Sequence, residues 1–168
     1  AVLLGGAMTA DGRGTSMTLP LLDGVVRAMD AAVKDAGVQF STLSYVETHG
    51  TGAPAGDATE LDALSKMILS HGAPKNGLAL GALKQIIGHT HASAGVAGLI
   101  KAILALQHRT IPPIRHIGVP RAPLTVGKGV CYYREELTPW EPSDAPRRAM
   151  VNTLGFGGIN CCLIVQEP

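Results

Sequence analysis

The chain has 168 residues, enough for one domain with a sizeable core. Hydrophobic residues make up 46% and aromatic residues only 4%, so the core must consist mainly of Ala, Val, Leu and Ile. The net charge is +1, from 14 basic and 13 acidic side chains without a basic run, which argues against a nucleic-acid-binding protein.

In chain order, residues 2–6 predict a buried strand and residues 10–16 a glycine-rich turn. The opening residues lack the positive region of a signal peptide, so we expect the strand to be entered within a longer protein. Apolar residues then recur at helical spacing over 21–33, and Gly37 suits the end of that helix.

Two further strand–helix units follow. Residues 43–48 predict a strand, after which Asp57 is expected to cap a helix, with Glu60 at capping-box spacing. Residues 78–82 predict the next strand. The helix over 93–107 is apolar almost all round, so we expect it to be buried on every side. It carries Lys101 and is too short to span a membrane.

The last third is irregular before it becomes regular again. Residues 108–148 are rich in proline and predict an ordered loop with one short strand near 130–133. Residues 149–154 and 160–166 predict two strands around the glycine-rich turn at 155–158. The alternation of strands and helices indicates an α/β layer.

Two histidines in glycine-flanked turns are the candidates for chemistry. His49 opens an HGTG sequence after a predicted strand, at the carboxyl end where α/β proteins collect ligands, and His89 follows Gly88. An imidazole can donate or accept a proton near neutral pH. On spacing alone, a local hydrogen bond is the favoured interpretation for His49 and a helix cap the alternative for His89. Lys84, alone in an apolar sequence, would ordinarily extend to water.

A nucleophile to accompany the histidines is missing. Cys161 and Cys162 lie in an apolar strand and Cys131 in a weak one, contexts that indicate small buried side chains rather than reactive thiols. The odd number of cysteines does not indicate a disulfide framework and favours a reducing cytosol. His91 lies two residues beyond His89, but a zinc site needs three or four convergent ligands, so we expect no metal.

Five motifs together resemble the C-terminal half of a β-ketoacyl synthase (ketosynthase), the condensing domain of fatty acid and polyketide synthases. These motifs occur in the family's order and are TADGRGTSMTLP (9–20), VETHGTGAPAGDATEL (46–61), GALKQIIGHTHASAGVAGLIKAILAL (81–106), IPP (111–113) and NTLGFGGIN (152–160). The resemblance implies one half of a thiolase-like α/β fold, layered α/β/α with a mixed five-stranded sheet.

The resemblance also implies roles for the motif residues. His49 and His89 correspond to the histidines of the family's Cys-His-His triad. Lys84 corresponds to a fixed charge beside the second histidine, often paired with a glutamate at the position of Glu60. Thr51 corresponds to a threonine that contacts the pantetheine arm.

The glycine-rich turn has an implied role as well. Phe156 corresponds to the residue that gates the acyl pocket and whose N–H helps to form the oxyanion hole, with Gly157 beside it in the substrate-binding motif. The chain departs from the family where Ala53 replaces a second threonine, Gln85 and Ile86 replace Ser-Asn, and Leu154 replaces a frequent phenylalanine. Leu154 in place of the larger phenylalanine should widen the acyl pocket.

The implied function is decarboxylative Claisen condensation of an acyl thioester with malonyl-acyl carrier protein. The nucleophilic cysteine would lie in an N-terminal half that precedes residue 1. Expected partners are that half, the acyl carrier protein and a second copy, but neither nucleic acid nor a membrane. Substrates would arrive on phosphopantetheine, without a metal or redox cofactor.

Two other functions remain open. A non-catalytic relative, such as a chain-length factor or a non-elongating carrier-binding domain, is favoured mildly by Ala53, Gln85 and Ile86. Both histidines and Lys84 argue against it. Thiolase-like chemistry with coenzyme A fits the fold but not the HGTG and GH motifs.

Overall fold

The computed structural model describes residues 1–12, 16–115 and 131–168. The strands are β1 (Val2–Ala10), β2 (Tyr45–Glu47), β3 (Leu78–Gly81), β4 (Thr110–Ile111), β5 (Cys131–Tyr132), β6 (Thr138–Pro139), β7 (Arg148–Gly155) and β8 (Ile159–Gln166). The α-helices are α1 (Leu22–Asp35), α2 (Pro54–Ser70), α3 (Lys84–Ile87) and α4 (Ala94–His108), and short 3₁₀ turns occupy Phe40–Thr42 and His91–Ser93.

A mixed sheet forms the centre of the molecule, in the order β1-β8-β7-β2-β3-β5. Strands β7, β2, β3 and β5 run parallel, whereas β8 is antiparallel to both β7 and β1. The α/β class is therefore confirmed, but the sheet has six strands rather than five. One edge of the sheet is β5, within the short strand predicted near 130–133, where Cys131 and Tyr132 pair with Leu78 and Ala79.

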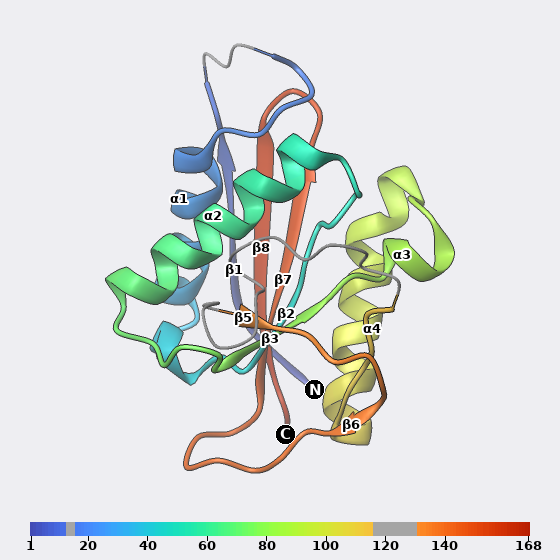
Figure 1. Cartoon of the computed structure of the whole chain (residues 1–168). Coiled ribbons are helices and arrows are strands. Elements are labelled where there is room, and N and C mark those ends of the chain that lie inside the picture. The colour runs from blue at the N-terminus through green and yellow to red at the C-terminus, as the bar shows by residue number, and fades with distance from the viewer. Residues whose placement is uncertain (13–15, 116–130) are drawn as a thin grey trace.

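Helices cover both faces of this sheet (Figure 1). Helices α1 and α2 pack on one face, and α4 packs on the other against β2 and β7. The larger apolar cluster lies under α1 and α2 and includes the fully buried Met29, Leu64 and Met150. A second cluster lies under α4, where Ala102 and Trp140 pack with Tyr45.

Two local expectations require correction. Helix α2 begins at Pro54, not at Asp57, because proline suits the first turn of a helix, where its missing N–H is not needed. Its N-cap is Ala53, so Asp57 lies inside the first turn and the predicted capping box is wrong. Strand β1 also extends to Ala10, well beyond the predicted strand at 2–6, because β8 supplies a partner along its whole length.

Helix α4 is where predicted but is not buried on every side. Gly98 and Ala102 face the protein, whereas Val96, Ile100 and Leu104 are 60%, 52% and 46% exposed. Because these three residues are spaced by four, they form one apolar stripe, here called the α4 stripe. Among the described residues no helix combines the length and apolarity that a membrane crossing requires.

Candidate functional site

The candidate residues follow three neighbouring parallel strands. His49 lies two residues after β2, Lys84 three residues after β3, and Phe156 directly after β7. Because β2 pairs in parallel with both β3 and β7, the carboxyl ends of these strands share one edge of the sheet. The fold therefore gathers segments that are far apart in the sequence at the edge where α/β proteins bind ligands.

His49 and His89 face one another across this edge. Their ring centroids are 5.5 Å apart and the ring planes meet at 82°. Burial lowers the pKa of His49 to about 4, with further lowering by the charges of Lys84 and His89. His49 is therefore neutral at pH 7. Its Nδ1 is buried without a hydrogen-bond partner among the described residues.

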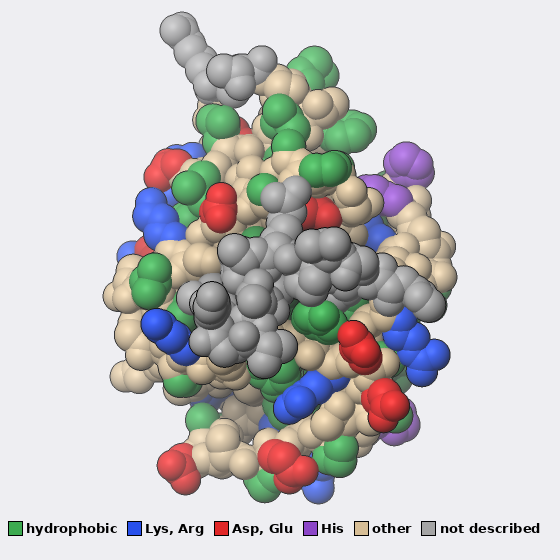
Figure 2. All heavy atoms as spheres, in the orientation of Figure 1, with side chains coloured by type: hydrophobic (Ala, Val, Ile, Leu, Met, Phe, Trp, Pro, Cys, Tyr) green, Lys and Arg blue, Asp and Glu red, His purple; other side chains and the backbone are tan. Residues whose placement is uncertain are grey.

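His89 is exposed and is oriented by the residues that follow it. The backbone N–H of His91 donates to His89 Nδ1 at 3.0 Å, so a neutral His89 carries its proton on Nε2. The His91 ring stacks on His89 at 5.1 Å, and histidine side chains gather at the surface above α3 (Figure 2). Desolvation, then the charges of Lys84 and His91, lower the pKa of His89. A neutral His89 therefore offers its Nε2–H as a hydrogen-bond donor.

Glu60 fixes the turn that carries His49. Its Oε1 accepts the His49 N–H at 2.7 Å and the Asn152 side-chain amide at 2.6 Å, and its Oε2 accepts the Gly50 N–H at 3.0 Å. Glu60 is only 2% exposed, and burial raises its pKa although the two backbone donors and Asn152 oppose this. Glu60 therefore supports the HGTG turn. Among the ion pairs of the described residues, with nitrogen and oxygen within 4.0 Å, there is none between Glu60 and Lys84.

We expect Glu60→Gln to destabilise the protein. A glutamine would direct an NH₂ group at one of three donors and leave a buried N–H unpaired, which costs about 1–3 kcal/mol. Urea unfolding of the variant measures this loss, with the exposed Glu141→Gln as the matched control. An unchanged midpoint would show that the three hydrogen bonds contribute little to stability.

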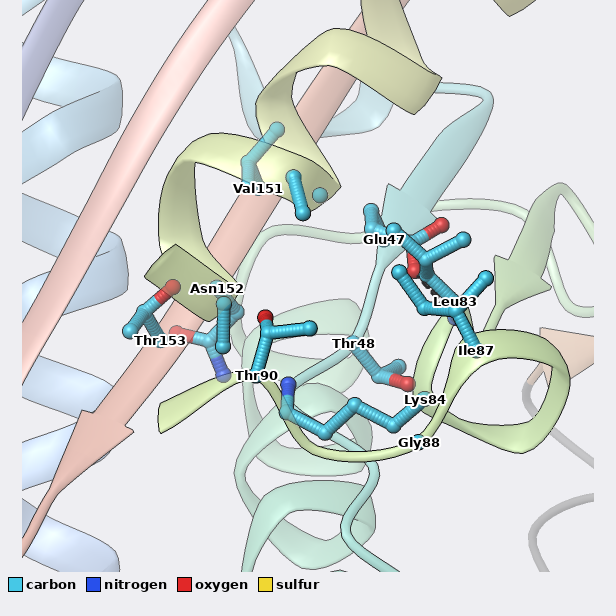
Figure 3. A pocket seen from close by; sticks show the side chains of 13 residues that line it. Glu47, Thr48, Leu83, Lys84, Ile87, Gly88, Thr90, Val151, Asn152 and Thr153 are labelled. Atoms are coloured by element: carbon cyan, nitrogen blue, oxygen red, sulfur yellow. Dashed lines mark hydrogen bonds between the residues drawn. The ribbon is translucent and has the colours of Figure 1, made fainter. Parts of the chain in front are cut away.

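Lys84 lies at the start of α3, beside the histidines. Burial lowers its pKa, while the carboxylates of Glu60, Glu47 and Asp57 oppose the shift. Lys84 also lines a cavity of about 10 Å³, which has room for about one water and which includes Glu47 and Asn152 (Figure 3). The Asn152 Oδ1 atom is buried there and has no partner among the described residues. Sequence reasoning missed Asn152, although it lies in the NTLGFGGIN motif.

The charge of Lys84 should be visible in the pH dependence of the site. With a His49 pKa of about 4, activity that needs neutral His49 should persist as the pH falls to about 5. Lys84→Met removes one cause of the lowered His49 pKa, so the acid limb of any pH–activity profile that depends on neutral His49 should move to higher pH. Lys84→Arg should leave the limb in place. An acid limb at the same pH in the Met variant would contradict this electrostatic role.

Other candidate residues lie farther out on the same edge. Thr51 is exposed, and its hydroxyl oxygen accepts the Ala53 N–H at 3.2 Å. Thr51 and Lys84 both line an open cavity of about 380 Å³. Phe156, at the tip of the β7–β8 hairpin, is 79% exposed, and the Gly157 N–H donates to the Met17 carbonyl at 2.8 Å. The structure thus brings Glu60, Lys84 and the two histidines together, whereas Phe156 is exposed on the hairpin and lines neither cavity.

Comparison with known proteins identifies the family. The family model described as "Beta-ketoacyl synthase, C-terminal domain" matches residues 1–118. The chain is 37% identical to erythronolide synthase EryA3 of Saccharopolyspora erythraea and 38% identical to polyketide synthase GfsA of Streptomyces halstedii, each over 99% of its length. The chain belongs to the C-terminal domain family of β-ketoacyl synthases.

Solved structures agree with this assignment. The ketosynthase from module 6 of the bacillaene synthase of Bacillus subtilis 168 superposes with a TM-score of 0.92 at 34% identity, over 99% of this chain and 30% of that one. A structure titled "PfaC Keto synthase-Chain length factor" superposes with a TM-score of 0.87 at 34% identity, over 99% of this chain and 17% of that one. The chain covers only 5% and 2% of the two curated synthases.

Proposed function

We propose that this chain supplies the two histidines and the lysine of a ketosynthase that performs decarboxylative Claisen condensation in a polyketide synthase. The observation that carries the proposal is the pair of facing imidazoles, both with lowered pKa values, beside Lys84. Loss of CO₂ from a malonyl thioester leaves an enolate, whose oxygen accepts hydrogen bonds from neutral imidazole N–H groups. The enolate carbon then attacks the acyl thioester and releases the cysteine thiolate.

The cysteine that carries the acyl group would come from an N-terminal half of the domain. Burial raises the pKa of Cys131 to about 12 and raises that of Cys162 even further, so neither thiol suits a nucleophile. Cys161 is half-buried, and burial raises its pKa as well. The further proposed partners are an acyl carrier protein and a second copy of the complete domain.

Malonyl would arrive on the phosphopantetheine arm of the carrier protein. Thr51 and Lys84 line one open cavity, which offers a hydroxyl and a charge to the arm. No step of this reaction requires a metal or a redox cofactor, because the carboxylate leaves as CO₂ and the electron pair remains on the enolate.

The principal test is to give the full-length protein an acyl thioester and malonyl-acyl carrier protein. A condensing enzyme will form the β-ketoacyl product and release one CO₂ for each bond formed. A non-elongating domain will accept and return the acyl group without CO₂ release, and a chain-length factor will do neither. Either of the last two results would replace condensation with a non-catalytic role.

Phe156 provides a separate prediction about specificity. If its exposed ring gates the acyl pocket, Phe156→Ala should broaden the range of accepted chain lengths, because the smaller alanine side chain blocks the pocket to fewer acyl chains. Competition between short and long acyl thioesters measures the change in kcat/KM ratio, and Cys162→Ser in the adjacent strand β8 is the control. An unchanged ratio in Phe156→Ala would remove the gate role and leave the condensation proposal intact.

A further inference from the structure

The structure contains a buried ion pair between α4 and β2 that the proposed mechanism does not use. Lys101 Nζ lies 2.8 Å from Glu47 Oε2, with side chains 11% and 2% exposed. The contact is an ion pair rather than a well-aligned hydrogen bond. We propose that Lys101 and Glu47 are positioning residues that hold the His49 segment and the Lys84–His89 segment in register. This inference rests on the proposed function and names part of the machinery that supports that site.

Glu47 joins the two catalytic segments directly. Glu47 is the last residue of β2 and lies two positions before His49. Its Oε1 accepts, at 2.6 Å, the N–H of Leu83, the residue that precedes Lys84 (Figure 3). A single carboxylate therefore lies between the start of the HGTG turn and the start of α3. Thr48 provides a second tie between these strand ends, because its N–H and its hydroxyl donate to the Gly81 carbonyl at 2.9 and 2.7 Å.

Lys101 determines which way this carboxylate points. Oε2 of Glu47 receives the Lys101 ammonium and the Tyr45 hydroxyl, the latter at 2.6 Å, which leaves Oε1 directed at the Leu83 N–H. A buried carboxylate without a cation is costly, so loss of Lys101 favours its protonation or its rotation toward water. Either change weakens the hydrogen bond to Leu83 and loosens the start of α3.

Glycines make room for the pair. A Cβ at Gly98 of α4 would lie 3.2 Å from Glu47 Cγ, and a Cβ at Gly81 would overlap the Tyr45 hydroxyl and Glu47 Oε2. Gly98 costs roughly 1 kcal/mol of helix propensity against alanine. The close approach of α4 to the Glu47 side chain explains why a small residue is needed there.

The alternative is that the pair only stabilises the core. Buried ion pairs can often be replaced by neutral residues without loss of stability, so stability alone does not separate the two roles. The hydrogen bond to Leu83 does separate them. Lys101→Met/Glu47→Gln removes both charges and keeps an oxygen for the Leu83 N–H, whereas Lys101→Met/Glu47→Leu removes both charges and that oxygen.

The experiment measures malonyl decarboxylation, with kcat and KM separated, in the full-length protein. We expect the Glu47→Leu double variant to lose about 10- to 100-fold in kcat with KM unchanged, because small displacements of catalytic groups have effects of this size. The Glu47→Gln double variant should retain kcat within about threefold of the wild type. Its kcat should also be higher than that of Lys101→Met alone. The exposed Lys66→Met is the control for removal of a lysine charge.

Equal kcat values in the two double variants would overturn the inference. If the Glu47→Leu protein does not fold, the comparison of Lys101→Met with its Glu47→Gln double decides, and no recovery of kcat in the double would overturn the inference. His89→Ala is assayed beside them. Wild-type decarboxylation in His89→Ala would reject the proposed function itself, whereas its loss together with equal double variants would reject only the positioning role.

Discussion

Replacing either His49 or His89 by alanine in the full-length protein should reduce malonyl decarboxylation by about 10²–10⁴-fold, the range typical for removal of a positioned proton donor or acceptor. The two imidazoles lie 5.5 Å apart between ring centroids, and in the proposed mechanism each variant removes one of the two donors to the enolate oxygen. Acylation of the nucleophilic cysteine should be less affected, because that step needs mainly the cysteine and the oxyanion hole. Radioactive CO₂ release and burst acylation measure the two steps separately.

The matched control is His108→Ala, which removes an exposed imidazole at the end of α4. Far-ultraviolet circular dichroism and urea unfolding establish that the His49 and His89 variants are folded. The Glu60 hydrogen bonds to the His49 and Gly50 N–H groups do not involve the imidazole, so we expect the turn to survive in His49→Ala. Wild-type decarboxylation in both folded variants would reject the assignment.

The elements that local chemistry specifies were predictable from the sequence. Helix α1 ends at Asp35 and is followed by Gly37 at φ 64°, as the helical spacing and the glycine predict. Helix α4 and the β7–β8 hairpin also match their predicted ranges within a residue or two. Apolar periodicity and glycine turns are local signals, so these elements do not depend on knowledge of distant contacts.

The supports of the site depend on contacts between distant residues and were not predictable in the same way. The spacing of Glu60 predicts a capping box, whereas its carboxylate binds Asn152, 92 positions away, and the HGTG turn. The pairing of Lys101 with Glu47 joins residues of α4 and β2, and no pattern along the chain indicates it. The resemblance to ketosynthases indicates the histidines, but the residues that hold them are visible only in the packing.

The α4 stripe should determine how the isolated chain behaves. Val96, Ile100 and Leu104 lie side by side on a helix that is otherwise packed on the sheet, and exposed apolar patches often mark an interface. We propose that an N-terminal half of the domain covers them. The lone chain of 168 residues should therefore aggregate or find a partner surface, and it should not condense malonyl units.

Ile100→Asp separates this proposal from general insolubility. In the lone chain it should increase the monomeric fraction, because it places a charge on an exposed stripe. In the full-length protein it should cost about 2–5 kcal/mol of stability, as expected when a charge replaces a well-packed buried side chain. Sedimentation of the lone chain and unfolding of the full-length protein are the two measurements.

The control is Leu69→Asp, on an exposed position of α2 that is 68% accessible, where we expect little effect in the full-length protein. If Ile100→Asp is as mild as Leu69→Asp in the full-length protein, the α4 stripe is not covered there. Conversely, a soluble wild-type chain that is acylated on Cys131, Cys161 or Cys162 and condenses malonyl units would show that no second half is required.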